Sequence, residues 1–413
     1  MAARFHRLLR GTDLKRGLLD NLRLSEAEEQ TLRSARDDIR ACIAAAFRRV
    51  GDDTSLRKAL MVERGLPPIY RSDAFLARFR PAPKFREQGS HAYGTLNDPV
   101  PEYAPPQQVD LDDGVFLPTS FVNGERPALA AKAYFRVVEE AVEPLCHERG
   151  WTLCSGEDAK KSCVRIQITP RIHVDLALYA LPDEDYEKAV DLAKAMMAQR
   201  AADAGTVMFS DEEYVSLPED HIMLAQRDGS WRRSDPRKLG DWFRDAVRRH
   251  GSHLRNVCRY LKAWRDYQWR DPDAGIPSIA LMSFAVRVFD ENRRVLDSGR
   301  EDDALLAVAE RMPDLLKVRV RNPVVDGEYL DDRWSTEERG AFVARAAALR
   351  DDLAAAADAT RADAVVARLR ARLGGRVPAD LDLIDILPSQ EAAVLSQPRV
   401  FTPAPVVGRS VSG

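Results

Sequence analysis

The chain has 413 residues, of which 45% are hydrophobic and 31% charged, an ordinary balance for a globular protein of two or three domains. Its 62 Lys and Arg against 65 Asp and Glu give a net charge of −3, whereas a protein whose main partner is duplex DNA or RNA usually carries a basic surplus. The five cysteines include no CxxC pair, which argues against a disulfide framework and a structural zinc site.

No window of the sequence approaches the roughly eighteen apolar residues of a transmembrane helix. The first residues, Met1 to Gly11, are interspersed with arginines and lack the apolar stretch of a signal peptide. We therefore expect a cytoplasmic protein with neither a membrane nor an obligatory nucleic acid as its partner.

The first half of the chain alternates between helical and strand patterns. Residues 24–50 predict a helix, because Ser25 can cap it and a glutamate follows three residues later. Residues 109–117 alternate like a strand, 127–148 predict a helix, and 163–180 predict a pair of strands. This order indicates a mixed α/β first domain.

From residue 235 the pattern becomes helical. Asp235-Pro236 is a good helix start, Ser252 can open the next helix, and an Ala-rich helical region over about 337–373 stops at Gly374-Gly375. The tail from Pro398 has no periodicity, and we expect it to be flexible.

Three aspartates are candidates for a metal site. Residues two apart on a strand project the same way, about 6.6–7 Å apart, so Asp110 and Asp112 could flank a pair of Mg²⁺ ions. Asp175, on a neighbouring strand, could complete the site for one metal and help deprotonate an attacking hydroxyl. Alone, an Asp-x-Asp pair in a chain this charged is most often a solvated strand face.

A Gly-Ser pair lies about twenty residues before this strand. Gly89 lets the backbone approach a triphosphate closely, and Ser90 can donate a hydrogen bond to it. Alone, the pair is also a plain turn. Together with the three aspartates, it indicates the arrangement of the polymerase-β-like nucleotidyltransferases.

Five blocks carry a more specific resemblance, and they keep their order and approximate spacing. They are Gln88 to Asn97, Asp110 to Gly114, His173 to Ala180, Trp231 to Pro236 and Val257 to Asp266. In these blocks the chain resembles the cGAS/DncV-like nucleotidyltransferases, and within them the bacterial cyclic GMP-AMP synthase branch. The likeness covers nearly the whole chain and fades in the Ala-rich region and the tail.

The resemblance implies an α+β fold, in which a polymerase-β-like nucleotidyltransferase core with a mixed sheet is joined to a helical second lobe and the active site lies in the cleft between them. We expect the core with its N-terminal helices over residues 1–234, the helical lobe over 235–397 and the flexible tail over 398–413.

The resemblance also implies roles for individual residues. Asp110, Asp112 and Asp175 would be catalytic and would bind Mg²⁺, with Mn²⁺ as a substitute. Matching positions imply nucleotide contacts by Gln88, Gly89, Ser90, Arg165, Ser234, Lys262 and Ser278, with Asp326 helping to select the base. The residues alone are less decisive, since Arg255, Arg259 and Lys262 form one basic helix face that fits a solvated surface equally well.

The implied function is synthesis of a 3′,3′-cyclic dinucleotide from ATP and GTP, with cyclic GMP-AMP the first choice, in antiphage (CBASS) signalling to a cyclic-nucleotide effector. The alternatives are a synthase of another cyclic di- or trinucleotide, a template-independent RNA polymerase, and a silent nucleotide-binding sensor. Base choice stays open, because residues 99–106 and 324–332 match only loosely.

Gly413 carries a separate hypothesis. Relatives of this kind are often encoded beside a ubiquitin-ligase-like pair that conjugates their C-terminus, which requires an accessible terminal glycine. The alternative is an ordinary frayed tail.

Overall fold

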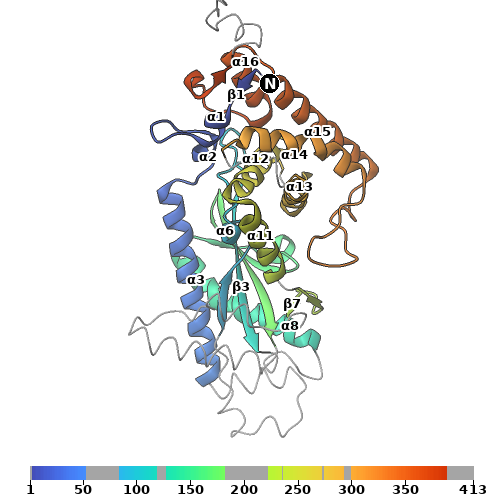
Figure 1. The fold of residues 1–413 in the computed structure, drawn as a ribbon. Coiled ribbons are helices and arrows are strands. Elements are labelled where there is room, and N and C mark those ends of the chain that lie inside the picture. Colours follow the sequence, from blue (N-terminus) through green and yellow to red (C-terminus); the bar gives the residue numbers. More distant parts are fainter. Residues whose placement is uncertain are drawn as a thin grey trace, which may run out of the picture.

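Two lobes make up the computed structural model, which describes residues 2–52, 83–118, 127–181, 222–234, 236–271, 274–292 and 299–387. Figure 1 shows a sheet with two covering helices in one lobe and a packed group of helices in the other. We call them the core lobe and the helical lobe. The expected tail and Gly413 lie outside the described residues.

The core lobe is built on a mixed sheet. Its strands are β2 (Lys84–Glu87), β3 (Val109–Pro118), β4 (Thr152–Leu153), β5 (Cys163–Thr169), β6 (Ile172–Leu181), β7 (Met223–Ala225) and β8 (Trp231–Arg233). The order is β2-β3-β6-β5-β4, and β7 pairs with both β6 and β8. The pairing of β3 with β6 is parallel, while the other pairings of this sheet are antiparallel, so the predicted α+β class with a mixed sheet is confirmed.

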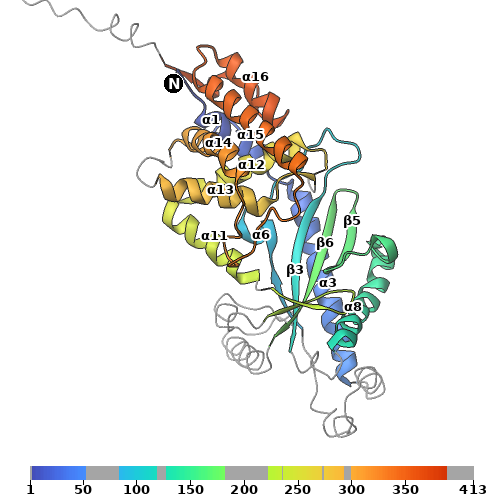
Figure 2. The ribbon, with the colours of Figure 1, turned by 90° about the vertical axis from the view of Figure 1, so that its right-hand side faces the viewer.

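One face of the sheet is covered by α3 (Glu26–Asp52) and α8 (Pro127–Arg149), as Figure 2 shows. Ser25 caps α3 as predicted, because its hydroxyl accepts from the Glu28 amide and the Glu28 carboxylate accepts from the Ser25 amide, each at 3.2 Å. On β3, Leu111 and Val115 pack into the same cluster of buried side chains as these helices. Strand alternation therefore leaves Asp110 and Asp112 on the opposite face.

The helical lobe contains α11 (Pro236–His250), α12 (Ser252–Gln268), α13 (Ser278–Glu291), α14 (Glu301–Lys317), α15 (Thr336–Ala357) and α16 (Ala362–Leu373). Most of α12 is buried, and Trp264 in its second half is fully enclosed. The Ala-rich region forms two helices, α15 and α16, and the second ends at Gly374 with φ +79°. A 3-10 turn, η4 (Leu381–Leu383), and β9 (Asp385–Ile386) follow.

The first residues of the chain belong to the helical lobe, whereas the sequence assigned them to the core. The elements β1 (Ala3–Arg4), α1 (His6–Arg10) and α2 (Leu18–Asn21) share the buried cluster of α12 and α14, and β1 pairs with β9. The helix α1 packs against α14 and α2 against α12, at the end of the molecule where Figure 1 shows α16. The apolar side chains of α1 must be covered by some surface, but the local pattern does not say by which lobe.

Two short elements complete the described chain, α6 (Gly89–Tyr93) beside β3 and the 3-10 turn η2 (Gly156–Asp158). Among the described residues, no helix combines the length and the apolar character needed to span a bilayer.

Candidate active site

The parallel pairing of β3 with β6 brings the three predicted aspartates together. Asp112 is opposite Asp175, and Asp110 is opposite His173. Ligand atoms of Asp110, His173 and Asp175 all lie within 4.8 Å of one another. The carboxylates thus converge on the face of the sheet that the covering helices leave open.

Arg165 orients Asp175. It lies opposite Asp175 on the neighbouring β5, and its Nε and terminal nitrogen donate to the two carboxylate oxygens at 2.7 and 2.6 Å. Such a bidentate pair fixes the plane of the carboxylate and offsets one negative charge. The predicted nucleotide contact of Arg165 is therefore taken here by a protein carboxylate.

The surroundings of Asp112 disfavour its charged form. Burial raises its pKa to about 7, and the nearby charges of Asp110 and Asp175 act in the same direction. Lys262 and Arg165 oppose that rise without cancelling it. Carboxylates held this close to one another are favourable only when positive charge is supplied to them.

This perturbation predicts a pH dependence in protein stripped of metal. The pKa of Asp112 is raised on folding, so its stabilising effect is complete below the unfolded value near 4 and is lost as pH rises towards 7. From pH 6 to pH 8 the wild type should lose about 1 kcal/mol more unfolding free energy than Asp112→Asn. Urea denaturation in EDTA at each pH measures this difference. An equal change of unfolding free energy with pH in the two proteins would contradict it.

Gly89 is pressed against Asp112. Its φ is +64°, and a Cβ added there would lie 1.8 Å from Oδ2 of Asp112. The amide of the preceding residue, Gln88, donates to the Asp112 carbonyl at 2.9 Å. The loop therefore rests directly on the carboxylate, and glycine is required for that approach.

Gly89→Ala should displace the Asp112 carboxylate and lower activity by about a hundredfold. The matched control is Gly156→Ala, because Gly156 has φ +61° and no atom within 4 Å of an added Cβ. Both variants carry the same backbone strain of about 1 kcal/mol, but only the first disturbs the site. Steady-state rates and melting temperatures of the two proteins measure this. Equal activities would show that contact with Gly89 does not position Asp112.

The other residues of the loop are placed as follows. The buried Gln88 accepts at Oε1 from the Tyr179 hydroxyl at 3.0 Å, so its side chain is packed against the sheet. Ser90 lies half-buried in the first turn of α6, and its carbonyl accepts from the Thr95 amide at 2.8 Å. Ser90 is adjacent to the carboxylates through Gly89, whereas the Gln88 amide lies over Gly114 and reaches Tyr179, further along the same face of the sheet.

Lys262 contacts the segment that follows α6. Its Nζ donates to the Thr95 carbonyl at 2.9 Å, and burial lowers its pKa to about 8. Ser278 accepts at Oγ from Arg265 at 2.8 Å and is the first residue of α13. Lys262 thus joins the helical lobe to the loop, while Ser278 is held by a neighbouring helix.

The two remaining predicted contacts lie on other segments. The half-buried Ser234 follows β8, and its amide donates to the Ile222 carbonyl at 3.1 Å. Asp326 is exposed in a turn of the helical lobe. That turn approaches β8, because Arg232 lies 3.8 Å from Glu328.

His173 belongs to the site and is absent from the sequence prediction. The signal was present, since His173 shares a strand face with Asp175. Among the described residues, neither its Nε2 nor Oδ1 of Asp110 has a hydrogen-bond partner, although both atoms are buried. Hard carboxylate oxygens with unpartnered buried acceptors fit a divalent cation.

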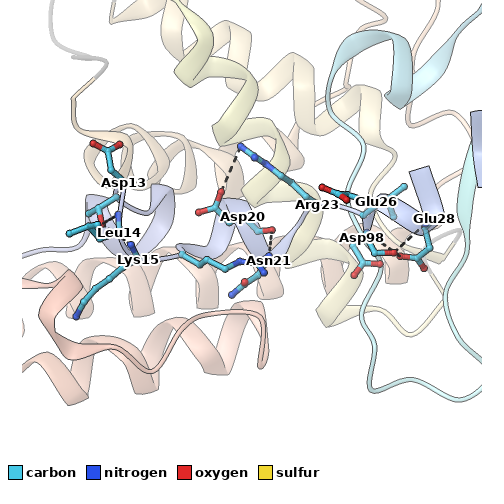
Figure 3. Close-up of a pocket in the computed structure, with 13 residues that line it drawn as sticks. Asp13, Leu14, Lys15, Asp20, Asn21, Arg23, Glu26, Glu28 and Asp98 are labelled. Carbon is cyan, nitrogen blue, oxygen red and sulfur yellow. Dashed lines mark hydrogen bonds and ion pairs between the residues drawn. The ribbon is translucent and has the colours of Figure 1, made fainter. Parts of the chain in front are cut away.

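A separate cavity of about 710 Å³ lies beside α2 and the start of α3 (Figure 3). Asp20, Arg23, Glu28 and Asp98 are among the residues lining it, and none of the predicted site residues is. It is therefore distinct from the carboxylate site.

Comparison with known proteins supports the same interpretation. The family described as cyclic GMP-AMP synthase DncV-like, nucleotidyltransferase domain, matches residues 83–179, and the cyclic GMP-AMP synthase C-terminal domain matches residues 251–385. A cyclic GMP-AMP synthase of Escherichia coli is 32% identical over 341 residues, which are 74% of this chain and 76% of that protein. One of Vibrio cholerae is 34% identical over 58% of this chain and 55% of that protein.

Solved structures of the Vibrio cholerae di-nucleotide cyclase share the fold. One in complex with ATP, GTP and 5MTHFGLU2 has a TM-score of 0.74 at 25% identity, and one of a double mutant has a TM-score of 0.76 at 25% identity. Each comparison covers 94% of this chain and 100% of the other.

Proposed function

The chain belongs to the DncV-like nucleotidyltransferases, and we propose that it joins ATP and GTP into 3′,3′-cyclic GMP-AMP as a signal to an antiphage effector. The observation that supports this most is the convergence of Asp110, Asp112 and Asp175 on the paired strands β3 and β6, with Gly89 pressed onto Asp112. A sensor that only binds nucleotide has no need for mutually repelling carboxylates.

The three aspartates would hold Mg²⁺ or Mn²⁺, which when bound supplies charge neutralisation to the triphosphate and lowers the pKa of the attacking hydroxyl. Gly89 lets the loop backbone approach the triphosphate, and Ser90 donates a hydrogen bond to it. The donor nucleotide is thereby positioned for attack by the ribose hydroxyl of the second.

Arg165 would couple nucleotide binding to Asp175. Its guanidinium now holds both oxygens of Asp175. An incoming triphosphate is a competing anion for that guanidinium. Partial transfer of Arg165 to the phosphates would free one Asp175 oxygen to accept the proton of the ribose hydroxyl. Nucleotide contacts by Lys262, Ser234, Ser278 and Asp326 are proposed from the family resemblance alone.

The experiment incubates purified protein with all four ribonucleoside triphosphates and Mg²⁺ or Mn²⁺, followed by phosphatase treatment and mass spectrometry. We expect a phosphatase-resistant product with the mass of cyclic GMP-AMP. A different cyclic mass would reassign the bases, and linear chains would indicate the template-independent polymerase. A protein that binds ATP and GTP without turnover would be the silent sensor.

Conjugation through Gly413 is a separate proposal, and it rests on the sequence alone. Cells carrying the ubiquitin-ligase-like pair should form a conjugate with the full chain and none when Gly413 is deleted. Equal conjugation of both chains would rule the proposal out.

A further inference from the structure

His173 faces Asp110 across the pairing of β3 with β6. Its side chain is only 6% exposed, and its Nε2 lies 3.1 Å from Oδ1 of Asp110. This contact is an ion pair only if the ring is protonated. Whether Nε2 carries a proton therefore decides whether it can donate to the carboxylate oxygen or only accept.

The second ring nitrogen shows where that proton lies. Nδ1 of His173 is 2.9 Å from Oε1 of Gln108, and the amide nitrogen of Gln108 donates to the Pro170 carbonyl at 3.3 Å. Assigned from the latter bond, the amide nitrogen points to Pro170 and the amide oxygen faces the ring. An amide oxygen only accepts, so Nδ1 carries the proton and donates it.

With one proton on the ring, at Nδ1, Nε2 presents a lone pair to the Asp110 carboxylate. A second proton on Nε2 would not make a hydrogen bond there, because among the described residues neither Nε2 nor Oδ1 of Asp110 has a hydrogen-bond partner. Two acceptors then face each other at 3.1 Å, and both are buried atoms without a donor among the described residues. Leaving such atoms unsatisfied is costly. A cation between them would satisfy both, and the third nearby donor is a carboxylate oxygen of Asp175, within 4.8 Å of each.

We propose that Nε2 of His173 is a ligand of the divalent cation, so that Asp110, Asp175 and His173 supply two oxygens and one nitrogen. Gln108 acts as the outer partner that fixes the tautomer of a metal-binding histidine. This proposal rests on the metal dependence of the proposed function and adds a ligand to it. A nitrogen ligand suits Mn²⁺ better than Mg²⁺, which prefers oxygen ligands and retains its waters.

Pulsed electron paramagnetic resonance of Mn²⁺ added to the metal-free full-length protein tests this without nucleotide or turnover. The wild type should show nitrogen coupling from a bound imidazole, and labelling histidine with nitrogen-15 should change that coupling. His173→Gln should abolish it and weaken Mn²⁺ binding by about tenfold or more, with a smaller effect on Mg²⁺. The isotope comparison uses the wild-type protein alone, so it does not depend on whether a variant folds.

His250→Gln is the matched control, because Nε2 of His250 also meets a carboxylate, that of Asp290 at 2.7 Å, but in the helical lobe. Its coupling and affinity should equal those of the wild type. Absence of nitrogen coupling in the wild type, or its persistence in His173→Gln, would overturn the proposal. If the protein makes the cyclic product but shows no nitrogen coupling, the proposed function stands and the His173 ligand is wrong. If it shows the coupling but makes no product, the His173 ligand stands and the proposed function is wrong.

Discussion

Replacing Asp110 and Asp112 together by alanine is expected to lower synthesis of the cyclic product at least about a thousandfold while the protein remains folded. Both carboxylates lie on the open face of β3, and neither supports the buried cluster behind the sheet. Their removal also relieves the repulsion that, with burial, raises the pKa of Asp112 to about 7. The melting temperature of metal-free protein should therefore stay constant or rise. Product quantification and circular dichroism measure the two effects.

The control for this pair is Asp351→Ala. Asp351 is an exposed residue of α15 that contacts the neighbouring Arg350, and its loss should leave the rate unchanged. An active double variant at Asp110 and Asp112 would remove the basis of the proposed mechanism. An inactive variant that had unfolded would instead show that the two carboxylates hold the sheet together.

Arg40→Ala is expected to cost about 3–5 kcal/mol of unfolding free energy. Arg40 of α3 donates to both oxygens of Asp113 on β3 at 2.7 and 2.6 Å, and each side chain is 1% exposed. The variant leaves a buried carboxylate without its guanidinium partner. Burial already raises the pKa of Asp113, so the uncompensated carboxyl should take up a proton on folding. Guanidinium chloride unfolding measures the loss.

Two further variants separate the buried charge from other effects. Arg40→Met combined with Asp113→Leu replaces both partners by apolar groups and should recover most of the loss. Arg136→Ala breaks the exposed pair with Glu140 and should change stability by less than about 0.5 kcal/mol. A cost for Arg40→Ala no larger than for Arg136→Ala would mean that water reaches the buried pair.

The carboxylate face could be predicted because it depends on local alternation. Strand parity placed Asp110 and Asp112 on one face of residues 109–117 without knowledge of any neighbour. The place of His173 in the site could not be predicted, because it depends on the strand register that sets His173 opposite Asp110. The same is true of Arg165, whose carboxylate partner lies on the next strand. Register is a tertiary property that single strands do not encode.

The burial of charged residues between the lobes could not be predicted from the sequence either. The alternative that Arg259 and Lys262 form a solvated surface is wrong, because both are buried. Arg259 donates to the Asn97 side chain and to the Leu22 carbonyl, each at 3.0 Å, and Lys262 donates to Thr95. A basic helix face looks the same in sequence whether its donors meet water or the carbonyls of another segment.

The pairing of β1 with β9 has a consequence for synthesis of the protein. Phe5 and Leu8 are translated more than two hundred residues before the helices that bury them. The core lobe lies between them in the sequence and can fold while the first residues still wait for their partners. Translation must therefore reach Asp385 before the helical lobe can close, and a nascent chain stalled earlier would expose an apolar N-terminal segment to chaperones.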